Sequence, residues 1–365
     1  MSQEKDRAKK PHYDIDNRGA FDYATRSRSA SAKHSAKHSA GTDNGKKRIS
    51  PALIIAVIVL AACLIVLGWY FYTAYEAKQN NREISDIFNN TPQYRVIHSA
   101  EEDVPDSTSE TSAPDTDDSD DSTVTEIVRE PLVITPSAQE LLNINPDTVG
   151  YVRIPGIIEE VVVQGDDDKY YLTHNFYDEV RQCGTCFADY RNIVNDYPDM
   201  QSDNIVLYAH NQADGSMFGN MDYYRWNYNY WQQNPFIYFS NNYEESTYVI
   251  ISSFVTNALP EHDDGNVFDY WNYINFNDTY SYDTFISEIT KRSTIITGVD
   301  VQPTDKFLTL STCSTEWDES RHAIIARRLR DDETVDGFDT SKLQINPNPK
   351  WPAVYYKYHG GSYTE

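Results

Sequence analysis

Cysteine and basic side chains are scarce in this sequence. Four cysteines in 365 residues are too few to build a disulfide-stapled scaffold. The 31 Lys and Arg residues are outnumbered by 56 Asp and Glu, and the resulting net charge of −25 argues against nucleic-acid binding. Hydrophobic residues make up only 39% of the chain, although it contains 28 tyrosines. We therefore expect disordered lengths around a well-packed, aromatic-rich domain.

One stretch lacks charge altogether, from Pro51 to Tyr72. Its length is sufficient for a helix to cross about 30 Å of hydrocarbon. Lys46, Lys47 and Arg48 precede it, and the aromatic run 69–72 ends it, so the positive-inside rule places the N-terminus in the cytoplasm. A cleaved signal peptide is the alternative, and the 50-residue leader and the long apolar run argue against it. We expect a single-pass protein of the cell membrane whose folded domain is extracellular.

Two polar regions flank this transmembrane segment. Residues 1–50 carry 12 basic and 6 acidic side chains and the repeat SAKHSAKHSA, which predict a disordered, basic cytoplasmic tail. Residues 73–130 form a stalk and an acidic linker. The stalk is compatible with a helix that either continues the membrane helix or packs on the folded domain. The linker contains Glu101–Ser122, with ten acids and no base, and is typical of a solvated, self-repelling chain.

Short β-like runs dominate residues 131–330, which we interpret as the folded domain. The runs are Gly150–Ile154, Glu160–Val163, Asn204–Ala209, Thr247–Val255, Lys306–Thr312 and Ala323–Leu329. Amphipathic helices are predicted at Ser137–Leu142 and Tyr282–Arg292. This pattern favours a mostly β barrel or sandwich with flanking helices. Residues 331–365 form a C-terminal extension of unknown role, in which 353–358 is predicted as an added strand or a tail on the barrel.

Three residues at the ends of β-like runs have the chemistry of a thiol enzyme. Cys313 ends KFLTLSTC, Arg321 begins the next run, and His210 ends NIVLYAH. A thiol nucleophile needs an imidazole partner and a cation for the developing oxyanion, and strand ends in a barrel meet at one rim. Taken singly, each has an ordinary explanation, such as a buried apolar Cys or a structural His.

Several motifs around these residues resemble the sortases, which are membrane-anchored cysteine transpeptidases of Gram-positive bacteria. The resembling segments are NPDTVGYVRIPG (145–156), FADYRN (187–192), LYAHNQADGSMFGNM (207–221) and SEITKRSTIITGVDVQPTDKFLTLSTC (287–313). The helix before the Cys-bearing strand and the GSMF segment after the His are similar to class B in particular. The resemblance implies an eight-stranded β-barrel, which agrees with the strand pattern.

The resemblance also implies a role for each candidate. Cys313 would attack a threonine carbonyl in the C-terminal sorting signal of a secreted protein, an NPxTx or LPxTG-like sequence, and form a thioacyl enzyme. His210 would protonate the leaving amine and deprotonate the incoming one, an amine on peptidoglycan or a pilin lysine. Arg321 would hold the peptide and stabilise the oxyanion, for which a planar guanidinium is suited. No cofactor or metal is implied.

Four neighbouring residues are secondary candidates for substrate binding. Ser311 and Thr312 precede the nucleophile, and because side chains alternate along a strand, Ser311 shares its face. Tyr208 and Asn211 flank the His and are placed to position it. Ordinary structural roles for all four stay open.

A rival histidine and a CxxC motif complete the list of reactive residues. His322 directly follows Arg321, so the two should point to opposite faces of the strand. Cys183 and Cys186 lack the second CxxC of a zinc site and the βαβ context of a redox motif. A local disulfide and two buried thiols both stay open for them.

Two other functions stay open beside the transpeptidase. An extracellular cysteine protease would resolve the same thioacyl intermediate with water rather than an amine. A catalytically silent surface-binding module would use the abundant Tyr and Trp side chains as a recognition groove.

Overall fold

The computed structural model describes residues 50–91 and 129–363. The basic tail up to residue 49 and the acidic run Glu101–Ser122 lie outside the described residues. The chain divides into two compact units, Met1–Ala62 and Cys63–Glu365. The described part of the first unit is the beginning of one long helix, and the second unit contains all the strands.

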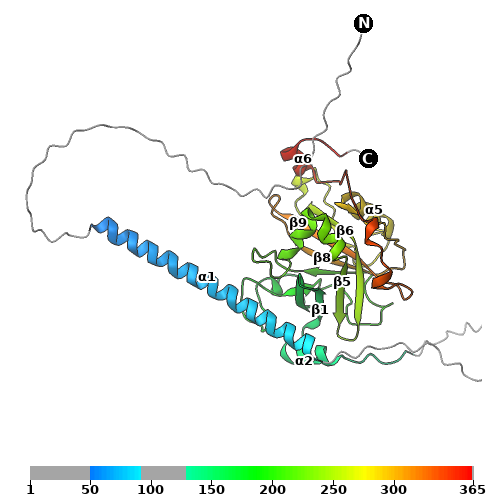
Figure 1. Ribbon diagram of the computed structural model, residues 1–365, viewed down its shortest axis with the longest axis horizontal. Coiled ribbons are helices and arrows are strands. Elements are labelled where there is room, and N and C mark those ends of the chain that lie inside the picture. Colours follow the sequence, from blue (N-terminus) through cyan, green and yellow to red (C-terminus); the bar gives the residue numbers. More distant parts are fainter. Residues whose placement is uncertain (1–49, 92–128, 364–365) are drawn as a thin grey trace, which may run out of the picture. The chain divides into compact units, whose positions relative to one another are not determined.

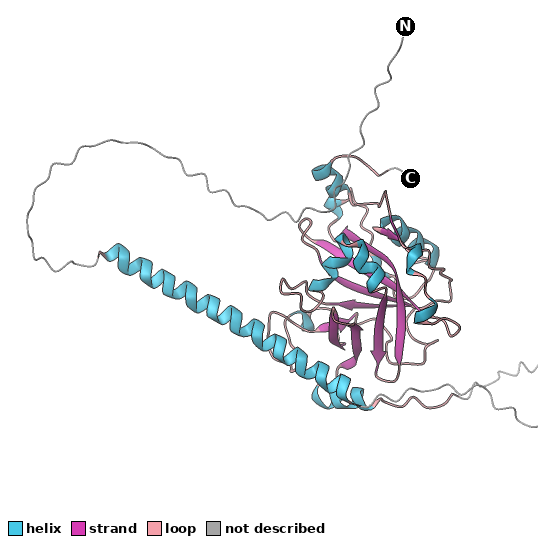
Figure 2. Ribbon diagram, viewed as in Figure 1, coloured by secondary structure: helices cyan, strands magenta, loops and turns pink. Residues whose placement is uncertain are grey.

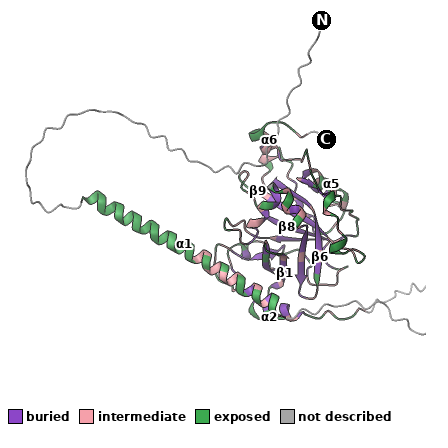
Figure 3. Ribbon diagram, in the orientation of Figure 1, coloured by how far each residue is buried: buried purple, intermediate pink, exposed green. Residues whose placement is uncertain are grey.

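The long helix α1 runs from Pro51 to Asn90, so it extends well beyond the apolar segment. Its apolar beginning is exposed throughout, and Figure 3 shows buried positions only toward its C-terminal end. By length and composition α1 is a candidate membrane span, as the sequence predicts. It continues past Tyr72 because the stalk that follows contains neither Gly nor Pro to stop it.

The C-terminal part of α1 packs on the strands of its own unit. Ile84 and Phe88, one helical turn apart, are both buried. The Phe88 ring stacks on Tyr151 with the ring centroids 4.1 Å apart. Ser85 on the same turn accepts a hydrogen bond from the Tyr151 hydroxyl at 3.0 Å. Both alternatives for the stalk are therefore realised in one helix, which continues the apolar segment and packs on the folded domain.

Eight strands form a closed barrel in the order β1-β2-β3-β4-β8-β9-β6-β5, in which β5 pairs back with β1 (Figures 1 and 2). The strands are β1 Thr148–Ile154, β2 Ile158–Val163, β3 Cys186–Ala188, β4 Asn204–Tyr208, β5 Phe236–Asn241, β6 Glu245–Asn257, β8 Phe307–Cys313 and β9 Ser320–Arg328. This confirms the predicted barrel. All six predicted β-like runs are strands of the barrel, and β3 and β5 are its two additional strands.

The remaining elements surround the barrel. The helices are α2 Pro136–Ile144, α3 Tyr223–Trp226, α4 Tyr228–Gln233, α5 Tyr282–Arg292 and α6 Ala353–His359. The short 3₁₀ helices are η1 Tyr170–Leu172, η2 Gly219–Asp222, η3 Pro260–His262, η4 Tyr270–Asn272, η5 Val335–Gly337 and η6 Thr340–Lys342. β7 Ile295–Ile296 and β10 Gln344–Ile345 pair as a separate two-stranded sheet. Of the two alternatives for 353–358, the added strand is wrong, because that segment is helix α6.

Side-chain alternation divides the apolar residues into an interior core and two outer clusters. Every barrel strand contributes to the interior core, for example through Leu207, Leu310 and Ile324. One outer cluster lies beneath α1 and α2, and the other lies beneath α5. Residues next to an interior position along a strand therefore face outward.

Candidate active site

Strand register brings the three predicted catalytic residues to one rim of the barrel. The antiparallel pair β8–β9 places Cys313 directly opposite Arg321. The parallel pair β4–β8 places Tyr208 opposite Ser311, and His210 and Cys313 each lie two residues further along. Because parallel strands end at the same edge of a sheet, His210 lies at the end of the barrel where Cys313 and Arg321 meet.

Cys313 and Arg321 share one face of the barrel wall with Tyr208 and Ser311. Their strand neighbours Leu207, Leu310 and Ile324 point into the interior core. Residues displaced from these by an odd number of positions point outward, and they are Tyr208, Ser311, Cys313 and Arg321. The thiol of Cys313 is exposed, as a nucleophile for a large substrate must be.

Main-chain and side-chain hydrogen bonds tie the Cys313 strand to the His210 strand. The Ala209 amide donates to the Ser311 carbonyl at 3.3 Å, and the Thr312 hydroxyl donates to the Ala209 carbonyl at 2.7 Å. The Asn211 side-chain amide donates to the Cys313 carbonyl at 3.0 Å. Two of the secondary candidates, Thr312 and Asn211, thus hold the nucleophile strand in place, and the Thr312 side chain is buried.

The His210 ring is oriented by a main-chain carbonyl. Its Nε2 lies 2.8 Å from the carbonyl oxygen of Leu172 in η1. A carbonyl only accepts hydrogen bonds, so we assign the proton of the neutral ring to Nε2, which leaves Nδ1 as the basic nitrogen. The loop that follows His210 folds back on it, and the Phe218 amide donates to the His210 carbonyl at 3.0 Å. Gly219 permits this closure, since a Cβ there would lie 2.1 Å from the Gln212 carbonyl oxygen.

The Arg321 guanidinium is half-buried and held by its own loop. Its Nη2 donates to Glu319 at 2.8 Å and its Nη1 to the Ser320 carbonyl at 3.1 Å. Burial acts to lower the pKa of Arg321, but the hydrogen bond to Glu319 and the nearby Cys313 and Tyr270 groups outweigh burial and raise it. The side chain is therefore a permanent cation beside the thiol.

Tyr270 is a member of the site that sequence reasoning missed. Its hydroxyl lies 2.7 Å from the hydroxyl of Ser311, and both groups are buried. Burial raises the pKa of Tyr270 to about 12, with Arg321 lowering it and Cys313 raising it. The hydrogen bond to Ser311 brings Tyr270 to the strand that carries Cys313, two residues before the thiol, and no motif around Tyr270 indicates this. Ser311 therefore lies beneath the thiol on the same face, bonded to Tyr270.

The loop between Cys313 and Arg321 is held by a second set of residues absent from the prediction. Arg225 in α3 is nearly buried and donates to Asp222 at 3.0 Å. Its other terminal nitrogen forms an ion pair with Glu316 of that loop. Asn211 donates to the second Asp222 oxygen at 3.4 Å. A polar chain therefore connects the residue after His210 to the loop after Cys313.

The remaining reactive residues lie elsewhere. His322 points into the barrel, where its Nε2 lies 2.8 Å from the Ser253 hydroxyl, and burial holds its pKa well below the ordinary value. It faces away from Arg321, as strand alternation predicts. Cys183 and Cys186 are free thiols whose pKa values are raised by burial. The structure has free thiols rather than a disulfide, and of the two expected buried thiols Cys186 is buried and Cys183 only partly so.

A buried carboxylate, Glu160 on β2, adjoins the loop that follows His210. It is 4% exposed. One oxygen accepts from the Asn81 side chain of α1 and from the Met217 amide, each at 2.9 Å. Burial raises the pKa of Glu160 to about 7, although the two hydrogen bonds lower it. Glu160 thus connects α1 to the loop whose Phe218 amide bonds the His210 carbonyl. This connection places an ionisable group in the interior.

Replacing Glu160 by Gln is expected to stabilise the protein at pH 8. The folded pKa of about 7 exceeds the ordinary 4.5, so the folded state binds the proton more tightly. The free energy of unfolding is therefore highest below pH 4.5, and it decreases by about 3 kcal/mol as the pH rises to about 7. In urea unfolding in detergent, the free energy of unfolding of Glu160→Gln should exceed that of the parent by about 1–3 kcal/mol at pH 8. The two values should be equal at pH 4.5. The exposed neighbour Glu159→Gln is the control. An advantage that is independent of pH would contradict this reading.

The known proteins that resemble this chain are sortases. No protein-family model matches the chain. It is 28% identical over 195 residues to sortase B of Staphylococcus aureus, covering 53% of this chain and 73% of that protein. It is 29% identical over 191 residues to sortase B of Listeria monocytogenes, covering 51% and 71%. The crystal structure of sortase B from B. anthracis matches with a TM-score of 0.53 at 22% identity, over 71% of this chain and 99% of that one, and shows the same fold.

Proposed function

Because this chain is a class B-like member of the sortase family, and thus a transpeptidase of the sortase type, we propose that Cys313 carries its acyl intermediate. The Cys313 thiolate adds to a threonine carbonyl in the sorting signal of a secreted protein, and a C–S bond forms. The C–N bond then breaks, and the C-terminal part of the signal leaves as an amine. An acceptor amine attacks the thioester, a new amide forms, and the thiolate is released.

His210 is the proton carrier in both halves of this reaction. In the first half the protonated ring gives its proton to the departing amine nitrogen, and in the second half the neutral ring takes one from the attacking amine. The hydrogen bond of Nε2 to the Leu172 carbonyl supports this assignment, because it directs Nδ1 to the proton exchange.

Arg321 stabilises the negative charge at each tetrahedral stage. It lies opposite Cys313 in the β8–β9 register and stays charged under all working conditions. A fixed cation beside the carbonyl favours both the thiolate and the oxyanion over the neutral ground state. Ser311, Thr312, Tyr208 and Asn211 bind the peptide directly or hold the groups that do.

The substrate is the C-terminal signal of a secreted protein, with an NPxTx or LPxTG-like sequence. The acceptor is an amine on peptidoglycan or on a pilin lysine. The candidate membrane anchor α1 holds residues 131–330, the catalytic domain, outside the cell, with residues 1–50 in the cytoplasm. Residues 73–130 connect the anchor to the catalytic domain, and residues 331–365 extend it.

One observation carries this proposal. Two different strand pairings, one parallel and one antiparallel, bring an exposed thiol, an imidazole and a guanidinium to the same outer rim. A buried structural cysteine would need neither an exposed position nor these two neighbours.

Mass spectrometry of the full chain in detergent, incubated with NPxTx and LPxTG-like peptides, tests the proposal. We expect a thioacyl adduct on Cys313 that resolves to a triglycine-joined product when triglycine is present. Hydrolysis alone, even with high triglycine, would favour the protease. No adduct with any peptide would favour the surface-binding module.

A further inference from the structure

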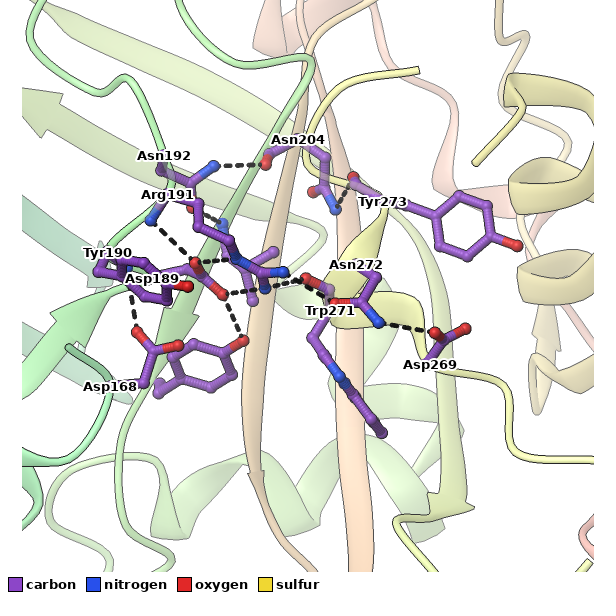
Figure 4. Close-up of polar contacts among 12 residues, drawn as sticks. Asp168, Asp189, Tyr190, Arg191, Asn192, Asn204, Asp269, Trp271, Asn272 and Tyr273 are labelled. Atoms are coloured by element: carbon purple, nitrogen blue, oxygen red, sulfur yellow. Dashed lines mark hydrogen bonds and ion pairs between the residues drawn. The ribbon is translucent and has the colours of Figure 1, made fainter. Parts of the chain in front are cut away.

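The FADYRN motif, residues 187–192, has no part in the chemistry proposed above, yet several hydrogen bonds join its charged pair, Asp189 and Arg191. The Asp189 side chain is fully buried. Arg191 grips it with two parallel hydrogen bonds, from Nε to Oδ1 at 2.8 Å and from Nη2 to Oδ2 at 2.7 Å (Figure 4). The Arg191 amide adds a third bond at 3.0 Å. The Arg191 guanidinium is thus fixed in one orientation.

The other edge of the Arg191 guanidinium reaches a distant segment. Nη1 donates to the Asn272 side-chain oxygen at 2.8 Å, and Nη2 donates to the Trp271 carbonyl at 2.9 Å (Figure 4). Both acceptors belong to η4, about 80 residues further along the chain. Arg191 therefore fastens η4 to the segment between β3 and β4.

The segment that Arg191 fastens is the one that touches the nucleophile strand. η4 begins with Tyr270, whose hydroxyl bonds to Ser311. On the other side, the Tyr208 hydroxyl donates to Asp189 at 2.9 Å, and Tyr208 lies opposite Ser311 in the β4–β8 register. Burial and the charge of Asp189 raise the pKa of Tyr208, which keeps its hydroxyl a donor. The contacts close a ring around Ser311, two residues before Cys313.

We infer that Arg191 is a positioning residue of the active site, which acts by holding Tyr270 against Ser311 beneath the thiol. This inference rests on the proposed function of Cys313. The role requires arginine, because one planar group must satisfy the Asp189 carboxylate and two acceptors on η4 at once. Lysine keeps the charge but supplies a single ammonium that cannot bridge the two segments.

The test compares Arg191→Lys with Arg330→Lys in the full chain in detergent. Arg330 grips a similarly buried carboxylate, Asp305, with the same pair of hydrogen bonds, both at 2.8 Å. Asp305 precedes β8, at the end opposite to Cys313. Arg330→Lys therefore removes a comparable pair of hydrogen bonds without touching the candidate active site. We expect Arg191→Lys to lower kcat/KM for transfer about 100-fold and Arg330→Lys to leave it unchanged. Equal losses in the two variants would overturn the inference.

A double-mutant cycle with Tyr270→Phe examines the route of the effect. Since Arg191 acts through Tyr270, the two losses in kcat/KM should be far from additive. Fully additive losses would mean that Arg191 acts by another route, and would overturn the inference.

The alkylation of Cys313 by iodoacetamide separates this inference from the proposed function. Its rate at one fixed pH should change in Arg191→Lys, because Tyr270 is no longer held against Ser311, two residues before the thiol. The rate should stay unchanged in Arg330→Lys. A parent chain that transfers no peptide would overturn the proposed function, while the alkylation comparison still decides the role of Arg191. An unchanged rate in Arg191→Lys would overturn that role.

Discussion

Cys313→Ala should abolish transfer to an amine, with a loss on the order of 10⁶-fold in kcat. The proposed reaction runs through a covalent bond to this sulfur, and among the described residues that β8 and β9 pair, Cys313 is the one thiol. The thiol is exposed at the end of β8, so its removal leaves no cavity in the core. Steady-state transfer with a sorting peptide and triglycine measures the loss, and intact-mass spectra should show no adduct.

Cys183→Ala is the matched control for this experiment. That thiol is partly buried, its pKa is raised by burial, and it lies in the loop before β3 rather than on the catalytic rim. Its removal should leave transfer at the parental rate. Substantial transfer by Cys313→Ala, with an unchanged thermal unfolding temperature, would refute the thioacyl mechanism.

Arg321→Lys should lower kcat for transfer by about 10²–10³-fold, the usual cost of removing one group that stabilises an oxyanion. The guanidinium uses Nη1 and Nη2 to bond the Ser320 carbonyl and Glu319, and this fixes the plane of the group beside Cys313. A lysine ammonium at the same position would pair with Glu319 and lose that plane. Because the loss is confined to the charged stages of the reaction, KM should change little.

Arg328→Lys provides the comparison on the same strand. Arg328 ends β9 at the opposite end from Arg321 and pairs with Glu244 at 3.0 Å. It should keep the parental kcat. A loss in Arg321→Lys that appears in KM alone would assign Arg321 to peptide binding and remove it from oxyanion stabilisation.

The barrel and the approach of Cys313 to Arg321 were predictable because they depend on local patterns. Each long strand is an apolar run bounded by turn residues. Cys313 ends one run and Arg321 begins the next, and the two runs pair as antiparallel neighbours. β3 was not predictable, since three residues are too few to show a period. β5 follows directly on the aromatic helices α3 and α4, and its own aromatic residues blur the boundary.

The supporting residues of the site were hidden for a different reason. Tyr270, Asp222 and Arg225 lie in 3₁₀ turns and a one-turn helix between strands, where no hydrophobic period indicates which way a side chain points. Their partners are set by tertiary contacts between loops. The helix α6 was missed similarly, because a seven-residue helix that contains three tyrosines reads equally well as a strand.

The parallel pairing of β4 with β8 also has a consequence for the order in which the molecule folds. The Asn211 side chain and the Cys313 carbonyl that it bonds are 102 residues apart in the chain, and closing so long a loop costs entropy before any contact repays it. β8 and β9 come late in the sequence, so the thiol meets His210 only when nearly the whole domain has emerged and the barrel has closed. An incomplete chain therefore exposes no assembled catalytic centre, and enzymatic activity reports the completion of folding.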